Sequence, residues 1–152
     1  MSANTSKGSH NTLAAERRKA RHYAMQGLYQ WYMASAPLNA IEAEFRADYD
    51  FSHVDLEYFQ AVLHGVPTCV DELEEIFQPL LDRGIDDLDP IERTLLRMGV
   101  WELKERIDVP YKVAINEAVA LAKKFGASES HKYINGVLDK AARELRQAET
   151  SA

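Results

Sequence analysis

A cluster of positive charge lies near the start of the chain, where residues 16 to 23 are Glu-Arg-Arg-Lys-Ala-Arg-His-Tyr. Four of the five Lys and Arg among the first 22 residues fall between Arg17 and Arg21, although the 152-residue chain has a net charge of −6. Guanidinium and ammonium groups gathered this closely attract a polyanion. The cluster of Arg17, Arg18, Lys19 and Arg21 therefore predicts a contact with nucleic acid.

Charge is zoned along the sequence. Residues 23–92 carry fifteen Asp and Glu against two basic residues, and residues 93–152 carry eleven Lys and Arg against eight acidic residues. The acidic middle zone is typical of a solvated face. We expect the basic residues of the two ends to contribute to nucleic-acid binding if the ends meet in the fold.

A second candidate binding segment lies at residues 128–133, Ser-Glu-Ser-His-Lys-Tyr, at a predicted helix start. The N-terminus of a helix offers unpaired backbone N–H groups that suit a phosphate. Lys132 adds a positive charge, and an aromatic ring such as Tyr133 can stack on an unpaired base. The alternative is that Tyr133 packs against the edge of the core and Lys132 is only solvated.

Catalytic and metal-binding motifs are not evident. The five histidines show no HxxxH or HExxH spacing, and Cys69 is the only cysteine, which argues against a zinc site. There is no phosphate-binding Gly-rich loop and no nucleophile elbow, and a solvated helix face explains Glu72, Glu74 and Glu75. We therefore predict a protein that is not an enzyme and needs no metal or cofactor.

Composition is that of an ordinary globular chain, with 46% hydrophobic and 28% charged residues. No apolar run approaches the roughly 20 residues of a bilayer span, and the polar N-terminus lacks a secretory signal. A single cysteine in an apolar context is typical of a buried thiol in the cytosol. We expect a cytoplasmic protein with a disordered extension over residues 1–13, one helical domain over 14–146 and a tail over 147–152.

Hydrophobic periodicity predicts an all-α fold, a compact bundle of about six or seven helices with short connections. Pro37 ends the first helix, and the Gly65-Val66-Pro67 step favours a break or kink. We expect Asn39, Ser52 and Ser128 to cap helix starts, Pro90 to occupy the first position of a helix and Gly126 to end one.

The first helix has two distinct faces. The predicted core face consists of Ala20, Ala24, Gly27, Leu28 and Trp31, and the stripe on the opposite side consists of Arg18, His22, Met25 and Tyr29. This opposite stripe combines basic and aromatic residues and indicates a contact surface, although a helix inside a bundle would also bury Met25 and Tyr29.

Much of the chain resembles a known family. Residues 109–118 (Val-Pro-Tyr-Lys-Val-Ala-Ile-Asn-Glu-Ala), the Leu-Ala-Lys and Phe-Gly steps up to residue 126, and residues 130–140 (Ser-His-Lys-Tyr-Ile-Asn-Gly-Val-Leu-Asp-Lys) are similar to the C-terminal signature of the bacterial transcription antitermination factor NusB family. The arginine-rich start and the 92–103 segment also resemble that family. The resemblance runs from about residue 14 to residue 142.

The resemblance implies two packed helical subdomains and an RNA-binding activity that needs a partner. Family members bind the single-stranded boxA element of nascent RNA as a heterodimer with NusE, a ribosomal small-subunit protein. They act with the RNA polymerase elongation complex and other Nus factors, especially on ribosomal RNA operons. Some relatives form homodimers, and the sequence leaves open whether this chain is a monomer or a homodimer.

Site residues follow from the resemblance by matching motifs. It implies that Tyr29 and Glu92 lie where the family meets its protein partner or the edge of the RNA site. The implied RNA-binding residues are Arg17, Arg18, Lys19 and Arg21 at the start, Arg97 in the middle, and Glu129, Lys132 and Tyr133 at the last helix. Lys19 stands where an arginine is usual, which keeps the charge but loses the planar fork.

Alternative functions remain open at this point. RNA cytosine methyltransferases carry a similar helical module, although a chain ending at residue 152 leaves no room for their cofactor-binding domain. A protein-binding helical adaptor would make the basic cluster incidental. A helix-turn-helix DNA-binding protein is disfavoured because no polar recognition helix follows a short helix.

Overall fold

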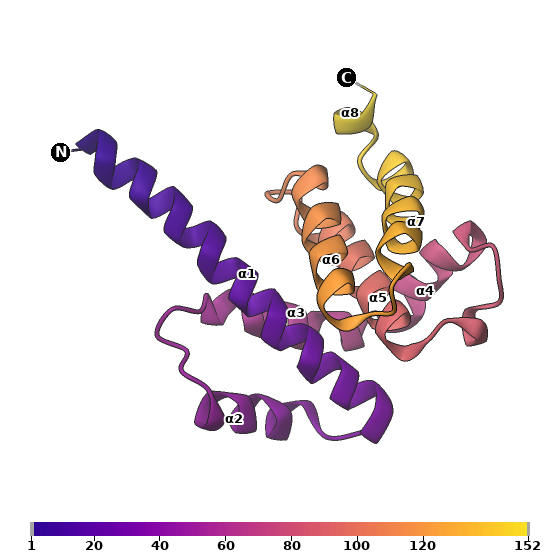
Figure 1. Ribbon diagram of the computed structural model, residues 1–152, viewed down its shortest axis with the longest axis horizontal. Coiled ribbons are helices and arrows are strands. Elements are labelled where there is room, and N and C mark those ends of the chain that lie inside the picture. Colours follow the sequence, from indigo (N-terminus) through magenta and orange to yellow (C-terminus); the bar gives the residue numbers. More distant parts are fainter. Residues whose placement is uncertain (1, 152) are drawn as a thin grey trace. The chain divides into compact units, whose positions relative to one another are not determined.

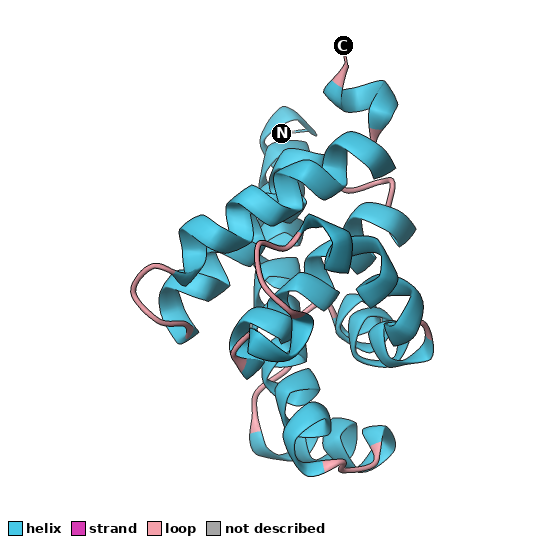
Figure 2. Cartoon of the chain, turned by 90° about the vertical axis from the view of Figure 1, so that its right-hand side faces the viewer, coloured by secondary structure: helices cyan, strands magenta, loops and turns pink. Residues whose placement is uncertain are grey.

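The computed structural model describes the backbone of residues 2–151 and the side chains of residues 12–151. This part of the chain consists of helices and connecting loops without any strand, which confirms the predicted all-α class (Figure 2). The helices are α1 (Ser2–Ala34), α2 (Leu38–Asp48), α3 (Leu56–Thr68), α4 (Val70–Phe77), α5 (Pro90–Glu105), α6 (Tyr111–Phe125), α7 (Ser130–Leu145) and α8 (Gln147–Thr150), with short 3-10 helices η1 (Gln78–Leu80) and η2 (Ile85–Asp87). None of the helices over residues 2–151 has the length and apolar character required to cross a membrane.

The chain divides into two compact helical units where the sequence predicts one domain. Unit 1 extends to His64 and contains α1, α2 and most of α3, and unit 2 extends from Gly65 and contains the remaining helices (Figure 1). Two helical subdomains are also what the family resemblance implied. Each unit has its own set of buried apolar side chains.

Unit 1 is built on the apolar face of α1. Ala20 and Ala24 are fully buried, and a Cβ at Gly27 would lie 3.0 Å from Leu63 and 3.1 Å from Ile41. Small residues on this face therefore allow α2 and α3 to approach α1 closely. The predicted core face is confirmed except that Trp31 is only half-buried.

Met25 departs from the predicted opposite stripe of α1. It is 1% exposed, whereas Tyr29 on the same stripe is half-buried. The helix is covered on more than one side, so a flexible thioether fills space that a two-faced helix would leave open to solvent.

Unit 2 is organised around α5, which is buried along most of its length between α4, α6 and α7. The helix is buried continuously from Thr94 to Leu103, a stretch that includes the polar residues Arg97 and Glu102. The two helices α6 and α7 pack against each other as well as against α5 (Figure 1). A Cβ at Gly99 would lie 2.6 Å from Leu138, so this glycine sets the close approach of α5 and α7.

Helix ends agree with the sequence at some positions and differ at others. Pro90 begins α5 and Gly126 ends α6, as expected. The predicted caps Asn39, Ser52 and Ser128 are wrong, because these helices begin at Leu38, Leu56 and Ser130. At the start of α3 the cap is Asp55 and not Ser52: the Asp55 carboxylate accepts a hydrogen bond from Tyr58 N. Asp is as good an N-cap residue as Ser.

The expected break at Gly65-Val66-Pro67 lies inside α3, which continues to Thr68. A Cβ at Gly65 would lie 2.7 Å from the Trp101 ring, so the glycine serves packing within unit 2 and does not end the helix. The helical conformation is interrupted at Cys69, between α3 and α4, where φ is −125° and ψ is 29°.

The two ends of the chain differ from their predicted states. The sequence predicts a disordered extension over residues 1–13, whereas the backbone of α1 is helical from Ser2. A helix elongates readily from a formed nucleus, and the residues after Leu13 supply one. The predicted tail over residues 147–152 contains α8, whose Glu149 accepts a hydrogen bond from Tyr111 N at the start of α6.

Candidate nucleic-acid interface

The basic cluster of α1 divides into two pairs of residues. The guanidinium groups of Arg17 and Arg21 lie over the Tyr58 ring, 4.7 Å and 5.1 Å from its centre, and Arg17 forms a 3.5 Å ion pair with Asp55. Arg21 is only 4% exposed. These two cations therefore help to hold α1 against α3, through cation–π contacts on a desolvated ring.

The other pair, Arg18 and Lys19, lies exposed on α1. Their side chains extend from the same helical turn as Arg17 and Arg21, so the cluster presents positive charge to solvent on unit 1. Tyr29, three turns further along α1, is half-buried. The basic cluster and Tyr29 thus lie on the same helix, α1. Within the cluster, Arg18 and Lys19 are the residues whose positive charge is exposed to solvent.

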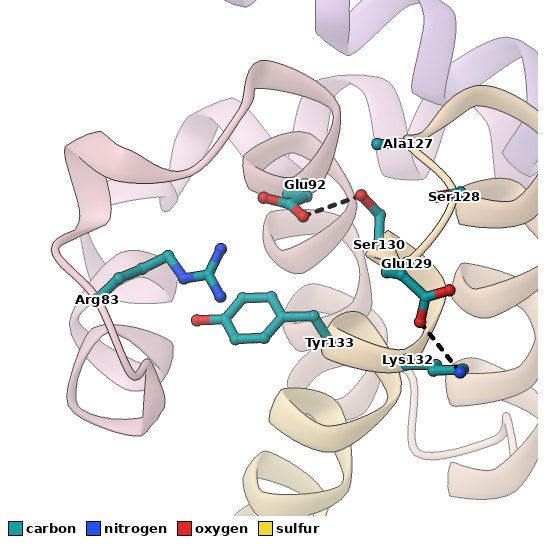
Figure 3. Close-up of a pocket in the computed structure, with 8 residues that line it drawn as sticks. All are labelled: Arg83, Glu92, Ala127, Ser128, Glu129, Ser130, Lys132 and Tyr133. Atoms are coloured by element: carbon teal, nitrogen blue, oxygen red, sulfur yellow. Dashed lines mark hydrogen bonds and ion pairs between the residues drawn. The ribbon is translucent and has the colours of Figure 1, made fainter.

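A pocket of about 550 Å³ lies in unit 2, between the start of α7 and the loop before η2 (Figure 3). It brings together four residues that the sequence singled out, Glu92, Glu129, Lys132 and Tyr133. The complete lining consists of Arg83, Glu92, Ala127, Ser128, Glu129, Ser130, Lys132 and Tyr133.

The aromatic wall of the pocket is the ring of Tyr133, and it is held from the opposite side by the 82–83 loop. Asp82 N donates a 3.4 Å hydrogen bond to Tyr133 Oη, and the Arg83 guanidinium lies 4.1 Å from the ring centre. Burial raises the pKa of Tyr133. The ring is therefore a neutral, half-buried stacking surface covered by a planar cation.

Arg83 is also paired with its neighbour. Its Nε donates a 2.8 Å hydrogen bond to Asp82 Oδ1. That hydrogen bond lowers the pKa of Asp82, so the pair is an ionised carboxylate beside a guanidinium. Arg83 is not among the candidate residues of the sequence. Its only signal was that it is one of two basic residues in the acidic zone of residues 23–92.

The floor of the pocket joins two helix starts. Glu92 forms a capping box with Asp89 at the start of α5, and Ser130 Oγ donates a 2.9 Å hydrogen bond to Glu92 Oε2. Glu92 is 7% exposed, so its carboxylate is used mainly within unit 2. This contact fixes the position of the α7 N-terminus relative to α5.

The rim of the pocket carries an exposed ion pair. Lys132 Nζ lies 3.0 Å from Glu129 Oε2, and both side chains are more than 70% exposed. An exposed pair of this kind contributes little to stability and is easily exchanged for another anion. Glu129 occupies the N-cap position of α7 without a side-chain hydrogen bond to the helix.

Arg97 does not line the pocket. It is 7% exposed, and its guanidinium lies 2.8 Å from the Glu74 carboxylate, which also pairs with Arg93 at 2.7 Å. Burial alone would raise the pKa of Glu74, but the hydrogen bonds and charges of the two arginines lower it. Arg97, a predicted RNA-binding residue, is therefore buried in unit 2, where its ion pair with Glu74 connects α5 to α4.

Comparison with known families identifies the chain. A family model described as "NusB family" matches residues 18–143, which include Arg18, Lys19 and Arg21 of the α1 cluster and the residues that line the pocket in unit 2. The chain belongs to the NusB family. It is 53% identical over 139 residues to the Transcription antitermination protein NusB of Pseudomonas fluorescens, a match that covers 91% of this chain and 84% of the relative.

Another NusB relative and two solved structures extend the comparison. The Transcription antitermination protein NusB of Alcanivorax borkumensis is 56% identical over 135 residues, covering 89% of this chain and 90% of the relative. The structure of T. maritima NusB matches with a TM-score of 0.75 at 23% identity, over 90% of this chain and 97% of that one. A structure described as antitermination factors NusB and NusE in complex with dsRNA matches with a TM-score of 0.69 at 24% identity, over 84% and 96%. At these identities the two structures establish the NusB fold.

Proposed function

We propose that this NusB-family chain is a transcription antitermination factor that binds single-stranded boxA-type RNA together with NusE. The observation that carries the proposal is the pocket in unit 2, where Tyr133, Lys132 and Arg83 surround the start of α7. An aromatic ring, two cations and a helix N-terminus are the groups that bind an unpaired nucleotide.

Single-stranded RNA fits this pocket better than a duplex. The ring of Tyr133 can stack only on a base whose face is open, and bases inside a duplex are stacked on their neighbours. The exposed Lys132 can bind a phosphate after exchanging its partner Glu129. We therefore assign base stacking to Tyr133 and phosphate binding to Lys132, with Glu129 at the rim.

The α1 cluster supplies a second set of phosphate contacts. Arg18 and Lys19 are exposed, and we assign them to phosphates of the RNA backbone. Such contacts position the RNA but do not distinguish one base sequence from another. Arg17 and Arg21 hold the cluster on α3 through Tyr58 and add to its positive field. Arg97 has no RNA contact in this proposal, because it is paired with Glu74.

The proposed protein partner is NusE. The relatives are named as antitermination proteins, and one structural neighbour is described as a complex of NusB with NusE. Tyr29, half-buried on α1, is the proposed partner contact, and the acidic zone of residues 23–92 would suit a basic ribosomal protein. In this proposal the chain works in the cytoplasm with the RNA polymerase elongation complex, and its role is binding without catalysis.

Titration of labelled boxA RNA at several salt concentrations, with and without NusE, tests the proposal. If three or four phosphates are neutralised, log K should fall with log salt at a slope of about −2 to −3. Scrambled RNA is the control ligand. Equal affinity for boxA and scrambled RNA in the presence of NusE would contradict the proposal and favour a protein-binding adaptor.

A further inference from the structure

Arg83 covers the surface that an RNA base would need. Its guanidinium lies 4.1 Å from the centre of the Tyr133 ring, which is contact distance. No base can lie between the two groups at that separation, since stacked rings are themselves 4.5–7 Å apart. Figure 3 shows the Arg83 side chain reaching from the 82–83 loop toward the hydroxyl end of the Tyr133 ring.

We propose that Arg83 is a displaceable RNA ligand: it covers the Tyr133 ring in the free protein and moves onto an RNA phosphate when a base stacks on that ring. This inference rests on the proposed function and adds a residue and a conformational step to it. The ligand group is the phosphodiester next to the stacked base.

The local structure permits this movement. Arg83 lies between η1 and η2, in a segment outside any α-helix, and its side chain is 40% exposed. Moving its guanidinium therefore breaks no helix and opens no core. The guanidinium group of Arg83 can exchange the Asp82 carboxylate for a phosphate. It binds either anion, the planar carboxylate or the tetrahedral phosphate, through two parallel N–H groups.

Asp82 has a specific part in this arrangement. Its carboxylate pairs with the Arg83 guanidinium at 2.8 Å, and its backbone N–H holds the Tyr133 hydroxyl at 3.4 Å. In the free protein the carboxylate competes with phosphate for Arg83. An Asp82→Asn variant keeps the backbone N–H but loses that competition, so it separates the two roles.

The first experiment measures the salt dependence of boxA RNA binding in the presence of NusE. For Arg83→Gln we expect the magnitude of the slope of log K against log salt to fall by about 0.7, the loss of one phosphate contact with a single strand. The Kd should rise by a similar factor for boxA and for scrambled RNA. For Asp82→Asn we expect binding about two- to five-fold tighter, the range for releasing an exposed ion pair.

A matched control pair is present on α7. Arg143 and Asp139 form an exposed 2.9 Å ion pair like that of Arg83 and Asp82, but neither residue lines the pocket. Arg143→Gln and Asp139→Asn make the same changes in net charge. Both control variants should leave the slope and the Kd unchanged within error, so a general effect of net charge would be recognised at once.

The second experiment observes the displacement directly by NMR. In the free protein the ring current of Tyr133 should shift the Arg83 side-chain protons upfield, and Tyr133→Leu assigns that shift. Saturating boxA RNA with NusE should abolish it. An upfield shift that persists at saturation, or an Arg83→Gln slope equal to that of the wild type, would overturn the inference while leaving the RNA-binding function intact. Loss of boxA preference in the wild-type protein would overturn both.

Discussion

Ser130 Oγ donates a 2.9 Å hydrogen bond to Glu92 Oε2, and this bond joins the first turn of α7 to the first turn of α5. The other oxygen of Glu92 accepts from Asp89 N, and Asp89 Oδ1 accepts from Glu92 N. One carboxylate therefore completes a capping box and positions a second helix. Because the pocket is built on the start of α7, its geometry depends on this junction.

Ser130→Ala should lower the free energy of unfolding by about 1–3 kcal/mol, because the buried Glu92 oxygen loses its donor. Ser128→Ala is the matched control, since Ser128 lies two residues earlier and is exposed. Urea unfolding followed by circular dichroism measures both. Equal stability of the two variants would show that the junction carries no net free energy.

The α1 cluster should separate stability from RNA binding. Arg21→Gln should lower the free energy of unfolding because Arg21 is buried over Tyr58, whereas Lys19→Gln should change it by less than about 0.5 kcal/mol. Lys19→Gln should instead reduce the magnitude of the salt slope for boxA RNA by about 0.7. The prediction fails if Lys19→Gln destabilises the fold or leaves the slope unaltered.

Acid should destabilise the protein partly through Glu74. Its pKa in the folded state is below its ordinary value because Arg93 and Arg97 stabilise the carboxylate. The stabilisation is therefore complete above the ordinary glutamate pKa of about 4.3 that applies to the unfolded state, and it is lost as the pH falls through the lower folded-state pKa. Thermal unfolding of wild type and Glu74→Gln between pH 7 and pH 3 measures this.

At pH 7 Glu74→Gln should be less stable by about 3 kcal/mol, a typical cost of leaving buried cations without their partner. The difference between the two proteins should narrow toward pH 3, where the wild-type carboxylate becomes protonated. Glu75→Gln, an exposed neighbour on α4, is the control. A difference that stays constant with pH would show that the charge of Glu74 is not the cause.

Periodicity predicted the helices and the core face of α1 because burial repeats every three to four residues. The sequence also singled out Lys132 and Tyr133 as candidates at a predicted helix start, and both lie in the first turn of α7 at the pocket. Periodicity left the burial of Met25 open and did not indicate the burial of Arg97, because both depend on the helices packed around α1 and α5. The hydrophobic pattern of one helix does not indicate how many neighbouring helices cover it, and α1 and α5 are covered on several sides.

Arg83 illustrates a different limit of the sequence. Its partners are Asp82 next to it and Tyr133, which is 50 residues away. No helical spacing links Arg83 to Tyr133, because the contact is made by an irregular loop. Likewise the capping box of Asp89 and Glu92 joins residues three positions apart in the sequence, but the additional bond from Ser130 to Glu92 requires the packing of α7 on α5.

Arg146 should be essential for the stability of unit 2. Its side chain is 1% exposed and donates hydrogen bonds to the carbonyl oxygens of Leu103, at 2.7 Å, and Arg106, at 2.8 Å, at the end of α5. Arg146→Ala would remove the donor of the Leu103 carbonyl oxygen and one of the two donors of the Arg106 carbonyl oxygen, which also accepts from Val109 N, so we expect a loss of about 3 kcal/mol. Arg143→Ala, an exposed arginine one turn earlier, is the control in thermal unfolding.

Arg146→Lys should recover only part of this loss. An ammonium group keeps the charge, but it lacks the planar fork that reaches several carbonyls at once. If Arg146→Lys were as stable as the wild type, charge alone would account for the role of Arg146.

Two glycines on facing helices should respond in opposite directions to alanine. A Cβ at Gly136 on α7 meets no atom within 4 Å, so Gly136→Ala should stabilise the protein by about 0.5–1 kcal/mol through reduced chain entropy in the unfolded state. A Cβ at Gly99 would lie 2.6 Å from Leu138, and Gly99→Ala should therefore destabilise it by about 1–3 kcal/mol. Urea unfolding midpoints distinguish the two signs. Two stabilised variants would mean that α5 and α7 can separate at no cost, contrary to the packing at Gly99.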